Sequence, residues 1–319
     1  MSKIIAPYSA AISVNSEILT SAANIAYEVG RLSLTGIATP TPSMIASEVH
    51  SSLRSDGVTL TPSQVRALSR GEEIVGHPEA HALFVLYSKM PRIDPYDPKF
   101  LETFESMVFP EGTPHRMSRK VESFPYTIPL RAKVPSMMKG IYNFARDKER
   151  HPLLVALLFY YEIMAIQPYS QFTRVLATYL MKAILVRYSK DFAAVPIAHT
   201  FFVHKEDLEE AYRASVEAQD TAPFIRKAMS LLENAVIRTQ KKLLREKASS
   251  TPLVDKLLSV MEDGTYYRAT ELLSLLGLTS RLGLAKNYLR PALEAKKIEM
   301  ANPLSKTDRN QRYKKVNEQ

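Results

Sequence analysis

The sequence predicts a mainly α-helical protein, in which a helical bundle with a small β-hairpin is followed by a C-terminal winged-helix domain. Three observations carry this prediction. Apolar residues recur at helical spacing along most of the first 245 residues. Thr-Pro pairs at Thr41 and Thr61 mark helix starts. The last 70 residues follow a pattern of three helices and a basic hairpin. With 319 residues, 45% of them hydrophobic, the chain is long enough for two domains.

The elements of the bundle follow from periodicity and from helix-breaking prolines. The segment 153–166 is apolar on nearly every side, which is typical of a helix at the centre of a bundle. It contains Glu162, and at 14 residues it is shorter than the ~20 that a membrane span needs. The segment 124–130, FPYTIPL, alternates bulky apolar residues, and its prolines favour an edge strand or hairpin. Further helices are expected over 16–34, from 42, and over 63–68, 79–90, 98–108, 135–146, 174–188, 205–219 and 223–247.

Three domains are predicted: an N-terminal helical region over 1–95, a core over 96–245 and a winged helix over 250–319, with the polar stretch 246–250 as linker. Within the last domain, helices are expected over 252–262, over 270–276 and after a cap at Thr279. Strands are expected at 298–300 and 311–316.

Positive charge is concentrated in the last quarter of the chain. The segment 236–319 holds 17 basic and 9 acidic residues, a net of +8, whereas the first 235 residues hold 25 and 24, a net of +1. Such asymmetry favours an anionic partner, most simply nucleic acid; a solvated basic tail or a protein-binding winged helix is the alternative. The residues predicted to contact DNA, on the third helix and in the hairpin, are Arg281, Lys286, Asn287, Arg290, Lys306, Arg309 and Arg312.

Composition excludes several other kinds of site. The chain has no cysteine, which rules out disulfides, thiolate zinc ligands and a cysteine nucleophile. Its 10 glycines include no GxGxxG or GxxxxGK[ST] motif. His77 and His81 lie four residues apart without an evident third ligand, so no metal site is predicted. Because the N-terminus lacks an apolar signal-peptide core, a cytoplasmic protein is expected.

The loop between the two helices at 153–166 and 174–188 reads QPYSQFTR over residues 167–174, and a helix N-terminus of this kind suits phosphates. The loop resembles the Fic family signature HPFx(D/E)GNGRxxR: Pro168 matches, and Tyr169 replaces the phenylalanine. The resemblance extends to Ser52, Asp56 and Gly57, which are similar to the inhibitory motif (S/T)xxxE(G/N). It also includes VPSMM at 134–138, after a flap hairpin at 124–130, and the winged helix often fused to Fic domains. It covers about 51–315.

Family members transfer AMP from ATP to a hydroxyl group of a target protein, with the motif histidine as general base and the acidic residue holding Mg²⁺. Here Gln167 replaces the histidine and Gln171 the acidic residue. Phe172 and Thr173 stand in the GNG stretch, which is one residue short. The resemblance therefore implies an impaired pseudoenzyme with no certain cofactor, acting as a DNA-binding regulator or interaction protein.

The alternative reading is an enzyme of AMP transfer or of another phosphate transfer, using ATP and Mg²⁺. In that case Ser170, Thr173 and Arg174 would bind the nucleotide. The candidate partners are DNA at the C-terminal domain, a target protein at the flap Phe124–Leu130 and a second copy in a homodimer, and no membrane partner is expected.

Overall fold

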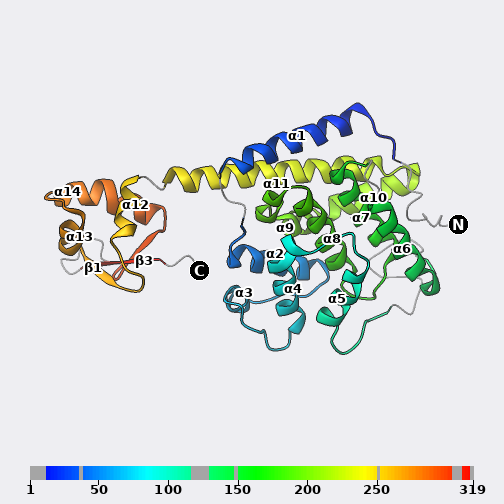
Figure 1. Ribbon diagram of the computed structural model, residues 1–319, viewed down its shortest axis with the longest axis horizontal. Helices are drawn as coiled ribbons and strands as arrows, with labels where there is room; N and C mark the ends of the chain where they lie inside the picture. Colours follow the sequence, from blue (N-terminus) through cyan, green and yellow to red (C-terminus); the bar gives the residue numbers. More distant parts are fainter. Residues whose placement is uncertain are drawn as a thin grey trace. The chain divides into compact units, whose positions relative to one another are not determined.

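The computed structural model describes residues 12–35, 39–115, 129–146, 150–249, 252–303 and 311–316 (Figure 1). It divides into two compact units, 1–239 and 240–319, which are considered separately below. The predicted mainly α-helical fold class is confirmed. Among the described residues, no helix is long and apolar enough to cross a bilayer. The predicted hairpin at 124–130 lies outside the described residues except for Pro129 and Leu130.

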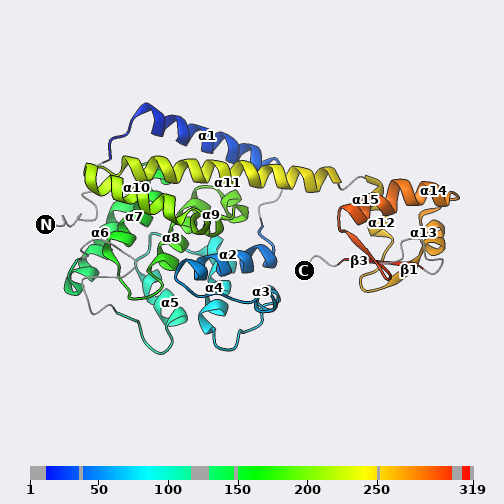
Figure 2. The same cartoon turned by 180° about the vertical axis from the view of Figure 1, so that it is seen from behind.

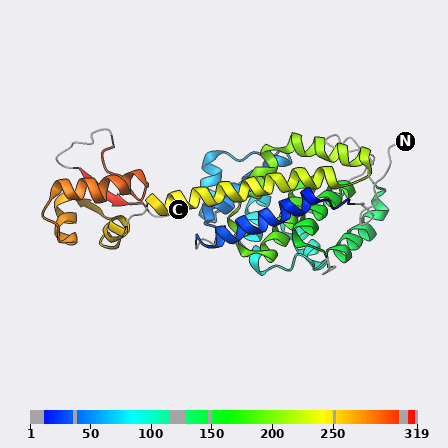
Figure 3. The same cartoon turned by 90° about the horizontal axis from the view of Figure 1, so that it is seen from above.

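The first unit is a bundle built around two buried helices. Helix α7 (Pro152–Ile166) is buried along almost its whole length and packs against α8 (Thr173–Tyr188), which is buried nearly as completely. The remaining helices surround this pair: α1 (Ser16–Ser33), α2 (Pro42–Ser55), α3 (Pro62–Ser69), α4 (Pro78–Lys89), α5 (Lys99–Val108), α6 (Val134–Ala145), α9 (Ile197–Val203), α10 (Lys205–Ala218) and α11 (Ala222–Ser249), with short 3₁₀ turns η1 (Met90–Arg92), η2 (Arg131–Lys133) and η3 (Lys190–Ala194). Figures 1 and 3 show α1 lying along α11, where Arg226 pairs with Glu17 at 3.5 Å.

Helix starts follow the capping signals in the sequence. The Thr41 hydroxyl accepts the N–H of Met44, and Thr61 forms a capping box with Gln64, each followed by proline at the first helical position. One expectation was wrong and one helix was missed. The stretch 246–250 was expected to be a linker, but α11 continues through Ser249. Helix α9 was not predicted, because its seven residues show no period and no capping side chain marks its start.

The second unit contains α12 (Pro252–Ser259), β1 (Tyr266–Arg268), α13 (Ala269–Leu276), α14 (Arg281–Leu284), a π-helical turn η4 (Ala285–Leu289), α15 (Arg290–Glu294), β2 (Ile298–Met300) and β3 (Arg312–Lys315) (Figure 2). The strands form an antiparallel sheet of order β1-β3-β2, in which Tyr313 of β3 faces Tyr267 of β1 and Met300 of β2. The unit has three helical segments: α12, α13 and the continuous run α14–η4–α15. Residues from these segments and from β2 form its core, among them Val254, Leu272, Leu284, Ala292 and Ile298.

Several details of this unit differ from expectation. Strand β1 was missed, because its three residues do not alternate visibly and no Asn-Pro turn follows them as it follows β2. The first helix ends at Ser259 rather than near residue 262, and Ser280, not Thr279, caps the third because its hydroxyl accepts the N–H of Gly283. Pro291 lacks the N–H that an α-helix would direct at the carbonyl four residues earlier, which accounts for the wider turn η4 just before it.

Candidate functional site

The corner between α7 and α8 begins with a glutamine that ends its own helix. Gln167 adopts a left-handed conformation (φ 51°), its N–H donates to the carbonyl of Ile163 at 2.9 Å, and its side-chain Nε2 donates to the carbonyl of Met164 at 2.9 Å. Only 4% of Gln167 is exposed. An amide does not take up a proton near neutral pH. Gln167 is therefore a buried helix cap, without the chemistry of a general base.

The loop after Pro168 is hydrogen-bonded to itself and to the segment before the flap. Thr173 Oγ1 accepts the N–H of Tyr169 at 3.2 Å and donates to its carbonyl at 3.1 Å. Ser170 donates to the carbonyl of Pro114 from both its N–H and its hydroxyl, each at 2.9 Å. Ser170 and Thr173, which the sequence predicts as nucleotide ligands, thus use these groups to hold the corner together.

Aromatic side chains fill the inside of this corner. Tyr169 and Phe172 are buried, and the Phe109 ring lies against both, with ring centroids 5.1 Å from Tyr169 and 6.0 Å from Phe172. The Tyr169 hydroxyl donates to Glu105 at 2.8 Å, and burial, together with the nearby Glu105 carboxylate, raises the Tyr169 pKa well above its usual value. The space beside the loop is therefore occupied by packed rings.

The N-terminus of α8 is capped by Asp56, which follows α2. Asp56 Oδ2 accepts the N–H of Val175 at 3.0 Å. Burial raises the Asp56 pKa to about 6, although the backbone N–H groups of Val175 and Arg174 and the charge of Arg174 favour the ionised form. Gly57, at φ 87°, makes the turn that follows. A helix N-terminus attracts anions, and here a carboxylate of the chain itself lies at that place.

The other predicted residues of the corner are placed as follows. Arg174 forms an ion pair with Glu209 at 3.0 Å. Gln171 is exposed, Pro168 is buried, and Ser52 is buried in α2 one turn before Asp56. Among the described residues, the groups that could bind a nucleotide with Mg²⁺ already have partners: an N–H at the helix start, the arginine and both loop hydroxyls. Gln171 offers a neutral amide at the motif position where Mg²⁺ prefers a carboxylate.

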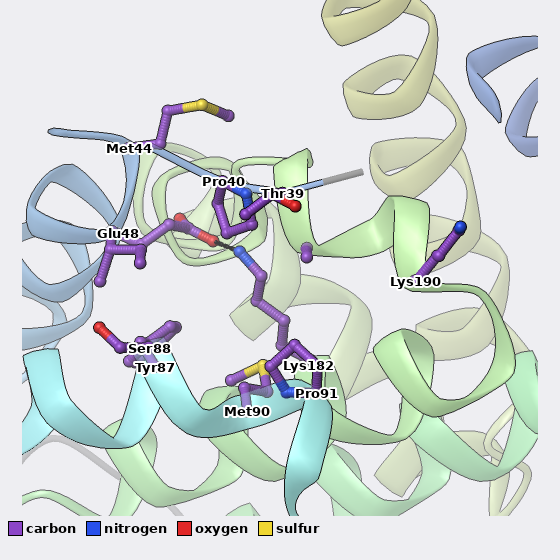
Figure 4. Close-up of a pocket in the computed structure, with 12 residues that line it drawn as sticks. Thr39, Pro40, Met44, Glu48, Tyr87, Ser88, Met90, Pro91, Lys182 and Lys190 are labelled. Atoms are coloured by element: carbon purple, nitrogen blue, oxygen red, sulfur yellow. Dashed lines mark hydrogen bonds and ion pairs between the residues drawn. The ribbon is translucent and has the colours of Figure 1, made fainter. Parts of the chain in front are cut away.

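Sequence reasoning missed a second contact between α2 and α8. Glu48 and Lys182 form a buried ion pair (Figure 4), and Lys182 also donates to the carbonyl of Val195 at 3.0 Å. Glu48 accepts the N–H groups of Ile197 at 3.0 Å and His199 at 3.2 Å. Glu48 lies two turns before Asp56, and Lys182 about two turns after Val175, so the two helices run antiparallel between the two contacts. The signal was a lysine within the otherwise apolar stretch 180–186 of α8.

In the second unit, the basic residues predicted to contact DNA lie on the segment α14–η4–α15. Arg281, Lys286, Asn287 and Arg290 are exposed, as is Arg312 on β3. The three cations of the helical segment form no ion pair with a described residue. By contrast, two strand lysines are neutralised, because Lys314 pairs with Glu299 at 3.2 Å and Lys315 with Asp263 at 3.0 Å. Lys306 and Arg309 lie outside the described residues.

The two histidines considered for a metal site do not gain a third ligand. His77 contacts Glu79 at 3.0 Å. Within the described ranges, no group of three histidine or carboxylate side chains is arranged to hold a metal ion. Two pockets open elsewhere on this part of the chain, and neither is lined by residues of the 167–173 loop.

Comparisons with known proteins agree with this architecture. Residues 252–315 match the family model described as "Filamentation induced by cAMP protein Fic-like, C-terminal domain". The fold resembles the crystal structure of a Fic family protein from Desulfovibrio desulfuricans, with a TM-score of 0.66, 23% sequence identity and coverage of 99% of each chain. No curated protein matches the sequence.

Proposed function

The chain has the fold of a Fic family protein and carries a Fic-like C-terminal domain, and from this premise we propose that it is a catalytically impaired pseudoenzyme that acts as a DNA-binding regulator. The observation that carries the loss of catalysis is the closed α7–α8 corner. Gln167 stands where the resemblance places a base, and Asp56 caps the helix start.

Among the described residues of the corner, each group that adenylyl transfer would need is replaced or already has a partner. Removal of a general base alone costs roughly 10²–10⁴-fold in rate, and loss of a positioned anion-stabilising donor costs about 10²–10³-fold more. Arg174, at the start of α8, is held by Glu209. For these reasons we place nucleotide transfer second.

The second unit supports the DNA-binding part of the proposal. Its strands β2 and β3 follow three helical segments and pair side by side, with β1 on the other side of β3, which is the arrangement expected of a winged helix. Arg281, Lys286 and Arg290 are exposed on the third helical segment without a described ion-pair partner. Unpaired cations on a helix of this kind are suited to phosphates and guanine edges.

DNA binding is tested on the full-length protein by fluorescence anisotropy with a labelled mixed-sequence duplex between 50 and 200 mM salt. We expect binding that weakens steeply with salt. The triple variant Arg281→Ala, Lys286→Ala, Arg290→Ala should weaken binding and reduce the log–log salt slope by up to about 1 for each phosphate contact removed. Its matched control removes three exposed lysines of the first unit, Lys99, Lys139 and Lys205, and should bind as the unchanged protein does. Absence of binding at 50 mM salt, or equal losses in the two variants, would contradict the proposal.

Catalytic impairment is tested by calorimetric titration with ATP, with and without Mg²⁺, followed by transfer of labelled AMP to a mixture of candidate target proteins. We expect neither Mg²⁺-dependent tight binding nor transfer above that of a heat-treated sample. Mg²⁺-dependent binding that is lost in Arg174→Ala would instead support the alternative, a nucleotide transferase with changed residues.

A further inference from the structure

A pocket opens in the first unit, and it is lined neither by the α7–α8 corner loop nor by the basic segment α14–η4–α15. It lies between the N-terminal half of α2, the C-terminal end of α4, α8 and η3, and measures about 300 Å³ (Figure 4). This volume is at the lower end of the range of small-molecule sites, which runs from ~300 to 1,000 Å³. None of the residues that line it has a role in the function proposed above, so the inference stands independently of that proposal.

The walls of the pocket are mostly apolar. Met44 and Ile45 come from α2, Met90 and Pro91 from η1, Pro40 from the segment before α2, and Ala193 from η3. Methionine side chains adapt to the shape of an apolar ligand, whereas the two prolines hold their backbone rigidly. These walls favour an apolar body over a sugar or a nucleotide.

The charges around the pocket favour one negative charge on the ligand. Glu48 and Lys182 neutralise each other, and Glu48 already accepts two backbone N–H groups, which leaves it satisfied (Figure 4). Lys190 lines the other end of the pocket, where Figure 4 shows its side chain directed away from the other labelled residues. It is exposed and forms no ion pair with a described residue, and its flexible four-carbon stem allows the ammonium group to turn toward the opening. The residues that line the pocket thus carry a net charge of +1, located at its rim.

We propose that this pocket binds a small amphipathic carboxylate. Its hydrocarbon part lies between Met44, Met90 and the two prolines, and its carboxylate pairs with Lys190 at the rim. Because Glu48 and Lys182 line the same pocket, a bound molecule contacts the ion pair that joins α2 to α8. A ligand that binds only the folded chain also stabilises it.

The probes for the test are hexanoate, octanoate and decanoate, with 1-octanol as the uncharged partner of octanoate, titrated calorimetrically into the full-length protein. Because each buried methylene contributes ~0.8 kcal/mol, affinity should rise about three- to fourfold per methylene until the pocket is full. Octanoate should bind more tightly than octanol.

Two variants locate the site, and one serves as a control. Lys190→Gln should weaken octanoate about two- to fivefold, the range expected of an exposed ion pair, and leave octanol unchanged. Lys139→Gln removes an equally exposed lysine from α6 and should change neither. Met44→Trp places a bulky indole ring at the half-buried wall and should weaken the binding of both probes. The chain has no other tryptophan, so the fluorescence emission of this residue also reports whether the variant is folded.

The outcomes separate clearly. A chain-length dependence with a specific loss in Lys190→Gln supports the proposal. Equal affinities for octanoate and octanol would overturn the assignment of an anionic ligand. No binding of any probe, or binding that a folded Met44→Trp leaves intact, would overturn the site itself.

Discussion

Asp56 makes a quantitative prediction about how stability depends on pH. Its carboxylate caps α8 through the N–H of Val175, and burial raises its pKa to about 6. An aspartate in an unfolded chain titrates near 3.8. The folded state therefore holds the proton more tightly than the unfolded state, and stability from this residue is fully present below pH ~4 and is lost as the pH rises through about 6.

The magnitude follows from the difference between the two pKa values. A difference of roughly two units at about 1.4 kcal/mol per unit predicts that the contribution of Asp56 to the free energy of unfolding falls by about 3 kcal/mol between pH 4 and pH 7. The substitution Asp56→Asn keeps an oxygen that accepts the Val175 N–H but removes the titration. Relative to the original chain, Asp56→Asn should therefore gain stability progressively over that interval and remain constant above pH 7.

The assay is urea unfolding, monitored by far-UV circular dichroism, of the original chain, Asp56→Asn and Asp56→Ala. It is repeated at half-unit steps of pH from 4 to 8. The alanine variant leaves the helix N–H without its acceptor and should lie about 1 kcal/mol below the asparagine variant at every pH. Parallel curves for the original chain and Asp56→Asn across the whole range would refute the reasoning. Such a result would mean that the carboxylate titrates alike in the folded and unfolded states.

Three further predictions concern buried groups of the first unit. Glu162 of α7 is 2% exposed, and burial raises its pKa to about 9. The free energy of unfolding should therefore fall by about 1.4 kcal/mol per pH unit between pH 6.5 and 8.5. In urea unfolding, Glu162→Gln should flatten this slope, and an unchanged slope would contradict the prediction. Lys182→Met leaves Glu48 buried without its ion-pair partner and should cost about 3–5 kcal/mol in unfolding free energy. Adding Glu48→Gln, which removes the charge but keeps an oxygen that can accept a backbone N–H, should recover part of this loss; a loss below about 1 kcal/mol in Lys182→Met would be evidence against the prediction. Tyr169→Phe removes the hydrogen bond to Glu105 and should lower the unfolding free energy by about 1.5 kcal/mol, whereas an unchanged midpoint in urea would show that the bond contributes nothing.

Local signals predicted most of the fold because they depend on a few neighbouring residues. The caps at Thr41 and Thr61 each join a threonine hydroxyl to a backbone N–H three residues later, and the almost wholly apolar pattern of α7 identified the central helix. The same reasoning fails for short elements without a signal at their ends. The three residues of β1 and the seven of α9 show no period, and α9 has no capping side chain, whereas the short helix α3 was recognised from its Thr-Pro start and β2 from the Asn-Pro turn after it.

The sequence located the candidate corner between α7 and α8. Which of its groups already have hydrogen-bond or ion-pair partners depends on contacts between segments that are distant in the sequence. The replacement of a titratable residue by Gln167 is visible in the sequence, because side-chain chemistry does not depend on the fold. That Asp56 reaches Val175, 119 positions away, and that Glu48 meets Lys182, 134 positions away, depends on how α2 packs against α8. No local pattern encodes such pairs, because burial and antiparallel packing bring them together only when the whole bundle forms. The sequence by itself thus determined which groups are present, and the tertiary structure alone decided which of them are free to bind.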